Sequence, residues 1–111
     1  MTEYHVHLTA AAQRDLDNAA DHIEFVLKNP QAADDLLNEA EEQLATLSKL
    51  PKRYTLVDDP VLSSWGIRFI AVKNYLAFYL VDEDSLTVQV VRFLYGKRDW
   101  AAILKHGVSI L

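Results

Sequence analysis

Residues Gly66 to Leu104 read GIRFIAVKNYLAFYLVDEDSLTVQVVRFLYGKRDWAAIL, and this stretch decides the fold. It contains three runs rich in β-branched and aromatic residues, which are typical of strands. The links between the runs, at Asn74 and at residues 82–85, are too short to hold a crossover helix, so successive strands are antiparallel. The stretch therefore predicts a three-stranded meander, with strands at residues 67–73, 75–81 and 86–95.

A further strand and two helices precede the meander. Apolar residues alternate with His5 and His7, so residues 4–9 have the period of a strand with one buried face, and we expect this strand to pair at an edge or in the centre of the sheet. Apolar residues then recur at helical spacing over residues 10–28 and 30–50. The short link between the two helices predicts an antiparallel helical hairpin.

The rest of the chain completes the order of elements. Residues 52–66 have no regular period and contain a turn signal, Asp59-Pro60. Residues 98–105 predict a final helix, with Gly107 as its stop signal. The expected fold is α+β, in the order β-α-α-β-β-β-α, with the helical hairpin packed on one face of a mainly antiparallel four-stranded sheet. A chain of 111 residues is long enough for one core, so we expect residues 1–111 to form a single domain.

The charges divide the chain into two halves. The net charge is −5 at pH 7, yet residues 1–65 hold 5 Lys and Arg against 12 Asp and Glu, whereas residues 66–111 hold 6 against 4. The total charge disfavours nucleic acid as a partner, while the second half leaves this option open; the alternative is that the acidic residues only solvate helices. The sequence has no apolar run of membrane-spanning length, no signal-peptide pattern and no cysteine, so we expect a cytoplasmic protein.

His5 and His7 are a candidate pair of metal ligands on the first strand. Two imidazoles on one face of a strand can bind a metal, but a third ligand at useful spacing is missing, since His22 falls on a helix and His106 lies near the C-terminus. We therefore expect no metal. The three glycines are isolated, so there is no glycine-rich phosphate loop, and we expect no cofactor.

Cations and tyrosines gather on the three strands of the meander and just after them. Cations hold phosphates and tyrosine rings stack on bases, so these residues are candidates for nucleic-acid contact or for RNA cleavage. The alternative is that tyrosines favour strands in any case and that the arginines form salt bridges to loop carboxylates. The candidates are Arg68, Lys73, Tyr75, Tyr79, Arg92, Tyr95, Lys97 and Arg98.

The same stretch resembles the C-terminal core of the ParE/RelE toxin superfamily, which includes toxins of the plasmid-stabilisation type. The matching features are a Gly-x-Arg opening at Gly66, Asn74-Tyr75 placed four residues before Tyr79, a Val-x-Val strand that ends in Arg92, and the step Gly-Lys-Arg-Asp-Trp that ends at Trp100. The first half is similar too: HLTAAAQRDLDNAADHI resembles the family's first strand and helix, and NPQAADDLLNEAEEQLATLSKLP resembles its second helix.

This resemblance implies a bacterial type II toxin that a small antitoxin holds inactive by wrapping extended and helical segments around it. Two target classes occur in the superfamily: RelE-like members cut mRNA in the ribosomal A site, and ParE-like members poison DNA gyrase. A homodimer and a toxin–antitoxin heterotetramer are both compatible with the resemblance. A third interpretation is a non-toxic module that keeps the fold and binds the antitoxin.

The residues that RelE-like ribonucleases use are incomplete in this sequence. Their pattern has an arginine after the tyrosine of the turn between the second and third strands, where this chain has Leu76. It also has a tyrosine six residues past the Gly-Lys-Arg arginine, where this chain has Leu104. Arg98 alone carries over cleanly, with Lys97 beside it, and Tyr95 or His106 is the candidate proton-transfer group.

We therefore favour a ParE-like inhibitor of DNA gyrase, with the ribosome-dependent endoribonuclease as the alternative. If the chain is an enzyme, the catalytic candidates are Arg98, Lys97, Arg68 and Tyr95. The candidates for contact with the target or the antitoxin are Arg92, Lys97, Arg98, Tyr75, Tyr79 and Trp100.

Overall fold

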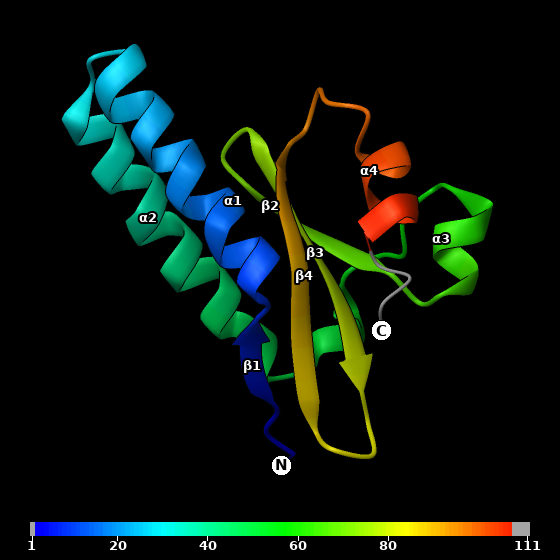
Figure 1. Ribbon diagram of the computed structural model, residues 1–111. Coiled ribbons are helices and arrows are strands. Elements are labelled where there is room, and N and C mark those ends of the chain that lie inside the picture. The colour runs from blue at the N-terminus through cyan, green and yellow to red at the C-terminus, as the bar shows by residue number, and fades with distance from the viewer. Residues whose placement is uncertain (1, 108–111) are drawn as a thin grey trace.

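The computed structural model describes residues 2–107, and a four-stranded sheet lies at its centre (Figure 1). The strand order is β1-β4-β3-β2. β1 pairs with β4 in parallel, whereas the other two pairs are antiparallel, which confirms the mainly antiparallel sheet and places the N-terminal strand at its edge. The strands are β1 (His5–Leu8), β2 (Arg68–Val72), β3 (Tyr75–Asp82) and β4 (Thr87–Tyr95).

Two helices form the predicted hairpin beside this sheet (Figure 1). Asn29 caps the second helix, because its side-chain oxygen accepts a hydrogen bond from the N–H of Ala32 at 3.1 Å, and Pro30 occupies the first turn. The N–H of Leu27 donates to the carbonyl of His22, five residues earlier, so the helix predicted over residues 10–28 widens before it ends. The segments are α1 (Ala10–Asp21), the π-helical turn η1 (His22–Val26) and α2 (Pro30–Ala45).

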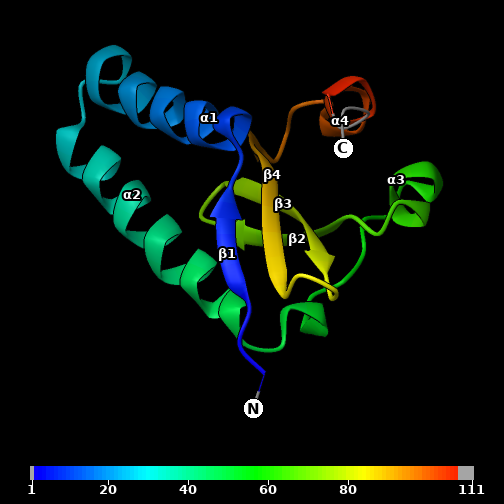
Figure 2. The same cartoon turned by 60° about the horizontal axis from the view of Figure 1, so that its bottom comes forward.

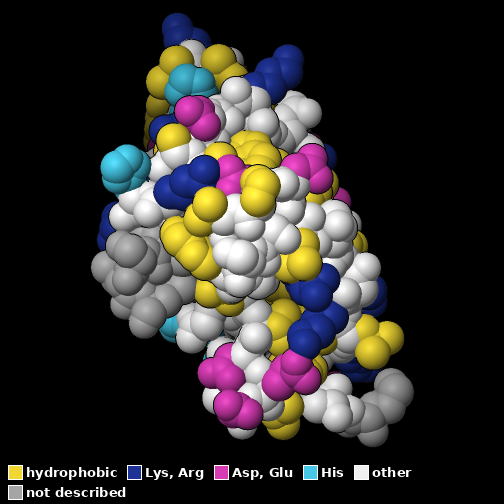
Figure 3. Space-filling model, turned by 90° about the vertical axis from the view of Figure 1, so that its right-hand side faces the viewer, with side chains coloured by type: hydrophobic (Ala, Val, Ile, Leu, Met, Phe, Trp, Pro, Cys, Tyr) yellow, Lys and Arg dark blue, Asp and Glu magenta, His cyan; other side chains and the backbone are white. Residues whose placement is uncertain are grey.

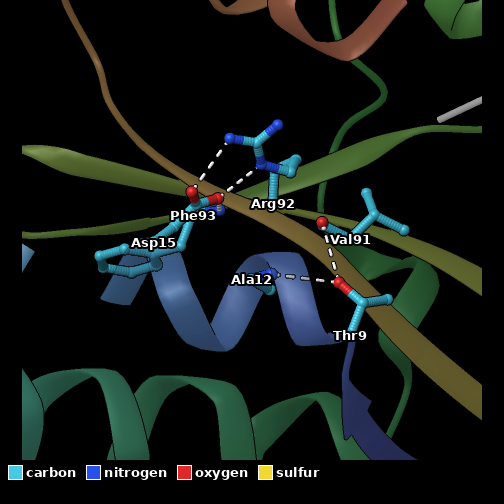
Figure 4. Close-up of polar contacts among 6 residues, drawn as sticks. All are labelled: Thr9, Ala12, Asp15, Val91, Arg92 and Phe93. Atoms are coloured by element: carbon cyan, nitrogen blue, oxygen red, sulfur yellow. Dashed lines mark hydrogen bonds and ion pairs between the residues drawn. The ribbon is translucent and has the colours of Figure 1, made fainter. Parts of the chain in front are cut away.

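Thr9 links the first helix to the sheet. Its hydroxyl oxygen accepts a hydrogen bond from the N–H of Ala12 at 3.1 Å, which caps α1. The same hydroxyl donates to the carbonyl of Val91 in β4 at 3.0 Å (Figure 4). A threonine hydroxyl can donate and accept at once, so one side chain both starts α1 and fixes its first turn to β4.

The sheet is covered on both faces (Figure 2). The helical hairpin covers one face, where Leu36 and Leu44 of α2 share a core with Val72 and Val90 of the sheet, as predicted. A smaller core on the other face joins Phe78, Ile67 and Leu94 to Leu62 and Leu104. The sequence does not predict this second layer.

The second layer begins in the segment that was predicted to be irregular. Residues 52–66 contain a short helix, α3 (Pro60–Ser64). The carboxylate of Asp59 accepts hydrogen bonds from the N–H groups of Val61 and Leu62 at 3.0 and 3.1 Å, so the Asp-Pro pair starts a helix and is more than a turn. This corrects the prediction for the segment.

The connection between α2 and α3 also differs from the prediction. α2 ends at Ala45 and is followed by two 3-10 turns, η2 (Thr46–Ser48) and η3 (Pro51–Arg53), so the second helix is shorter than predicted. Leu50 lies between these turns with a φ of 49° in the left-handed region, where a branched side chain is strained. The turn that follows Leu50 contacts the sheet, since the hydroxyl of Tyr79 in β3 donates to the carbonyl of Pro51.

The last helix, α4 (Trp100–Gly107), begins two residues later than predicted. Leu104 is fully buried in the second core, and the ring of Trp100 lies 5.2 Å from the ring of Phe78. The Nζ atom of Lys105 lies 2.8 Å from a carboxylate oxygen of Asp59 and so connects α4 to the start of α3.

None of the helices in the described residues is long and apolar enough to cross a bilayer. His5 and His7 are exposed on β1, and residues 2–107 contain no group of three or more His, Asp or Glu side chains that could hold a metal ion.

Candidate functional site

A groove of about 690 Å³ opens between α1 and the C-terminal end of β4. Its helical wall is formed by Asp15, Asn18, Ala19, His22, Ile23 and Leu27. Its strand wall is formed by Asn74, Tyr75, Phe93, Leu94, Tyr95 and Arg98. The groove therefore joins the first quarter of the sequence to the basic step after the last strand.

The spacing of the helical residues explains why they share the groove. Asp15, Asn18 and His22 follow one another at intervals of three and four residues, which places them on one side of α1 and η1. Leu16 and Ala19 are buried on the adjoining side of the helix. The polar row thus lies along the margin of the apolar stripe that holds α1 on the sheet.

Asp15 is fixed in place by β4 (Figure 4). Its carboxylate accepts hydrogen bonds from Nε and a terminal nitrogen of Arg92 at 2.6 and 3.0 Å, and from the N–H of Phe93 at 3.0 Å. The hydrogen bond to Asp15 raises the pKa of Arg92. Both side chains are largely buried, 14% exposed for Asp15 and 22% for Arg92, and the pair holds Asp15 in the wall of the groove.

Aromatic rings line the strand wall. The ring of Tyr75 stacks on that of Phe93, with centroids 5.2 Å apart, and meets the ring of Tyr95 edge-on at 5.6 Å. Burial, and to a lesser degree the neighbouring Tyr95, raises the pKa of the Tyr75 phenol. Tyr95 is 37% exposed, so its ring is available to a ligand while its other contact is the edge-on one with Tyr75.

The basic step follows directly from the end of β4. The N–H of Gly96 donates to the carbonyl of Asn74 at 2.9 Å, and the N–H of Arg98 donates to the carbonyl of Tyr95 at 3.0 Å. A Cβ at position 96 would lie 3.3 Å from the Asn74 carbonyl oxygen, so a glycine suits this close approach. The turn leaves the side chains of Lys97 and Arg98 exposed at the mouth of the groove.

The structure brings together three of the residues that the sequence singled out. Tyr75, Tyr95 and Arg98 line the groove, and Lys97 is exposed next to Arg98. Arg92 lies at the edge of the same region, but its guanidinium is occupied by Asp15.

Three other candidates lie elsewhere, so the cations and tyrosines of the meander do not all share one open surface. Tyr79 is 0% exposed, and its hydroxyl donates to the carbonyl of Pro51 at 2.6 Å; burial raises its pKa to about 12. Arg68 donates to the carbonyl of Tyr54 at 2.6 Å and thereby holds the segment after α2. Trp100 packs on Phe78 in the second core.

Sequence reasoning missed Asp15, Asn18 and His22 as groove residues. The signal was present, because polar residues at helical spacing beside an apolar stripe share one side of a helix. What the sequence lacks is any indication of which strand that side faces. The contact between Asp15 and Phe93 joins residues 78 positions apart.

A family model and solved structures relate this chain to known proteins. The family model described as the ParE toxin of the type II toxin–antitoxin system parDE matches residues 6–100. A search of curated proteins finds no match.

Among solved structures, a chain of the chromosomal ParDE toxin–antitoxin system from P. aeruginosa is similar, with a TM-score of 0.69 and 21% identity over 86% of this chain and 98% of that one. A chain of the toxin–antitoxin complex RelBE2 from Mycobacterium tuberculosis is also similar, with a TM-score of 0.55 and 20% identity over 84% of this chain and 98% of that one. At these identities the two structures support the fold, whereas the family match covers most of the sequence. This chain belongs to the ParE toxin family of type II toxin–antitoxin systems.

Proposed function

We propose that this chain inhibits bacterial growth by binding DNA gyrase in the cytoplasm, and that a cognate antitoxin neutralises it. In this proposal the toxin acts by protein contact, and the groove with its basic step contributes to the contact surface.

The observation that carries the proposal is the position of Leu104. The tyrosine that the resemblance to RelE-like ribonucleases calls for would stand here, but Leu104 is 0% exposed and packs in the second core with Leu94 and Leu62. A side chain that fills a core has no access to a substrate. Leu76, which stands where the expected arginine would be, packs against the same core.

The contacts that the arginines make within the fold also favour protein contact over RNA cleavage. The guanidinium of Arg92 is paired with Asp15, and that of Arg68 with backbone carbonyls. A site that cleaves RNA needs several cations to hold the phosphate and the charge that develops on it. Within the groove wall only Arg98 remains available for that purpose, together with the adjacent Lys97.

The surface gives further support. Figure 3 shows the face that carries α3 and α4, where hydrophobic side chains lie between scattered basic ones and acidic side chains gather at the end formed by the β3–β4 loop. Val61 and Trp65 are exposed there, at 46% and 43%. This mixed surface is more typical of a protein-binding toxin than of one that enters the anionic ribosomal A site.

A ribosome-dependent endoribonuclease is the second candidate, and one observation favours it. His22, Tyr95 and Arg98 line the same groove, so an imidazole, a phenol and a cation face a common space. These groups could serve as base, acid and phosphate holder.

Inducible expression separates these candidates. Expression of the chain alone should stop growth and switch on a DNA-damage reporter, and co-expression of the antitoxin encoded by a neighbouring short reading frame should restore growth. If the chain cleaves mRNA in a ribosome-containing translation extract, and Arg98→Ala abolishes this cleavage, the chain is a ribonuclease and not a gyrase inhibitor. Normal growth when the chain is expressed alone would indicate a non-toxic module that binds the antitoxin.

A further inference from the structure

Three turns of the chain lie at one end of the molecule. Figure 1 shows the link between α1 and α2, the β2–β3 turn and the turn between β4 and α4 at the same, upper end. Leu27 connects them, because it lines the groove together with Arg98 and also lines a smaller pocket of about 270 Å³ together with Lys73. We call residues 22–29, 73–74 and 96–99 together the turn end.

The turn end holds most of the cations that the fold leaves without a partner. Six of the eleven Lys and Arg side chains contact a carboxylate, an aromatic ring or a backbone carbonyl of the described residues. These six are Lys49, Lys52, Arg53, Arg68, Arg92 and Lys105. Four of the other five belong to the turn end, where all are exposed and none forms a salt bridge or a side-chain hydrogen bond within residues 2–107. These four are Lys28, Lys73, Lys97 and Arg98.

The turn end is therefore positively charged in an acidic chain. Its acidic residues are Glu24, which is half-buried, and Asp99, whose carboxylate accepts a hydrogen bond from the N–H of Ala102 at 3.4 Å. Two acidic residues thus stand against four cations, whereas the whole chain has a net charge of −5. Because like charges repel one another, an anionic partner at this end would relieve the repulsion between the cations.

Three successive large apolar side chains are exposed beside these cations. Phe25, Val26 and Leu27 are 67%, 64% and 60% exposed. Most of each side chain is in water, so the three contribute little to the core. A contiguous run of exposed apolar side chains is a mark of a contact surface. We call Phe25–Leu27 the apolar tip.

The way the first helix ends explains why the apolar tip is exposed. The N–H of Leu27 donates to the carbonyl of His22 at 3.0 Å, and the N–H of Asn29 donates to that of Ile23 at 3.0 Å, so the last turn is wider than an α-helical one. π-helical turns of this kind are frequent at functional sites. Lys28 follows with a φ of 56°, at a position where glycine is usual, so a strained residue places a cation beside the apolar tip.

The size and shape of the apolar tip indicate the kind of partner. Figures 1 and 2 show the hairpin projecting from the sheet with this turn at its far end. A stable dimer of two copies buries about 800 Å² on each partner, which is more than three side chains supply. A small convex apolar surface instead suits a pocket on a larger protein, where a few buried side chains supply most of the binding free energy.

The charges distinguish a protein from other anionic partners. DNA or RNA would neutralise the cations but offers no apolar pocket for Phe25. An anionic membrane would accept the apolar tip, but Asp34 and Asp35 are exposed on the first two turns of α2, directly after the tip, and a continuous anionic surface would repel them. A protein places its carboxylates one by one around a pocket, so it can pair with the cations and avoid these aspartates.

We propose that the apolar tip inserts into an apolar pocket on the gyrase target, and that carboxylates around this pocket bind Lys28, Lys73, Lys97 and Arg98. This inference rests on the proposed function and names the part of the toxin that anchors the target. The contact surface thereby extends from the groove and its basic step to the end of the hairpin, and Leu27 belongs to both.

Supercoiling of relaxed plasmid by purified DNA gyrase tests the apolar tip. The double variant Phe25→Ser/Val26→Ser removes two exposed side chains that do not line the groove. We expect the concentration of toxin that halves supercoiling to rise about tenfold or more, while the urea midpoint of unfolding stays unchanged. Leu86→Ser is the matched control, because Leu86 is 41% exposed in the β3–β4 loop, outside the turn end, and it should change inhibition about twofold or less.

The same assay separates the inference from the function on which it rests. Equal inhibition by the wild-type chain and by Phe25→Ser/Val26→Ser would overturn the inference and leave gyrase inhibition in place. No inhibition by the folded wild-type chain would overturn the proposed function itself.

Charge reversals test the carboxylates around the pocket. Lys28→Glu and Lys73→Glu should each weaken gyrase inhibition about three- to tenfold at low salt, and added salt should reduce the effect because it screens exposed charges. Arg14→Glu is the control, since Arg14 is an exposed cation on α1 outside the turn end. Reversals no more harmful than Arg14→Glu would contradict the proposal. Binding of the wild-type chain to duplex DNA without gyrase, lost in Lys28→Glu, would assign the cations to DNA and would overturn it as well.

Other occupants of the apolar tip give distinct results with the double variant. Phe25→Ser/Val26→Ser should bind the antitoxin as tightly as the wild-type chain does, and a selective loss of antitoxin binding would assign the tip to the antitoxin. A wild-type dimer in light scattering that the double variant does not form would assign the tip to a second copy. Sedimentation of the wild-type chain, but not of the double variant, with phosphatidylglycerol vesicles would assign it to a membrane. Each of these three outcomes overturns the proposal.

Discussion

The carboxylate of Asp15 in α1 binds the guanidinium of Arg92 in β4 through two hydrogen bonds of 2.6 and 3.0 Å. It also accepts the N–H of Phe93, so it occupies the strand edge at the point where β1 has ended. One side chain thus connects the helical hairpin to the sheet and lines the groove.

Asp15→Ala should destabilise the fold, because it leaves the charge of Arg92 and the N–H of Phe93 without their partner in a largely buried place. We expect a loss of about 2–4 kcal/mol in the free energy of unfolding, measured by urea denaturation. Asp17→Ala is the matched control, since Asp17 lies on an exposed side of the same helix, and it should change stability by less than about 0.5 kcal/mol. Equal effects of the two substitutions would contradict this role of Asp15.

The raised pKa of Tyr79 predicts a loss of stability at alkaline pH. Its folded-state pKa is raised to about 12 by burial, above the value of 10.0 of an unperturbed phenol. The stabilisation of the neutral phenol is therefore fully present below pH 10 and is lost as the pH rises through about 12. The difference in unfolding free energy between wild type and Tyr79→Phe should shrink over this range by about 2–3 kcal/mol. Parallel pH profiles of the two proteins would refute the assignment.

The lowered pKa of Asp59 predicts a loss of stability at acidic pH. The hydrogen bond from Lys105, followed by that from the N–H of Leu62, lowers the pKa of Asp59 below its usual value of 3.8. Its contribution is present above that value and is lost as the pH falls through the lowered pKa. Because Lys105 is on α4, release of α4 at low pH should change the tryptophan fluorescence, to which Trp100 of α4 contributes. Asp59→Asn should remove much of this acid transition, whereas Asp58→Asn, at an exposed neighbouring position, should leave it in place.

Leu104 tests whether α4 is held by the second core. The side chain is fully buried against residues of α3 and the sheet, so Leu104→Ala should cost about 2–5 kcal/mol of stability. Ala102 is exposed on the same helix, and Ala102→Ser is the matched control with an expected change within about 0.5 kcal/mol. Urea denaturation measures both, and a mild effect of Leu104→Ala would show that α4 is not anchored by this residue.

The fold could be predicted because its signals are local. The period of two in the strands, the short links of the meander and the proline between the helices each act over a few residues. The sequence did not predict α3, because this helix is only five residues long and is stabilised by the cap from Asp59 and the burial of Leu62. Such a short helix has too few turns to show a period.

The site could be predicted only in part, for a related reason. Tyr75, Tyr95, Lys97 and Arg98 follow each other along or across one hairpin, so the sequence indicated that they belong together. The position of Tyr79 depends on an eight-residue strand whose register carries its side chain into the core, and that of Asp15 on a long-range contact to Phe93. Neither can be read from local spacing.

The most direct test of the central claim is the supercoiling of relaxed plasmid by purified DNA gyrase in the presence of this chain. We predict that the wild-type chain blocks supercoiling, that Arg98→Glu blocks it at least tenfold less well than Arg14→Glu, and that the antitoxin restores supercoiling. Normal supercoiling at a large molar excess of folded wild-type chain would contradict the account.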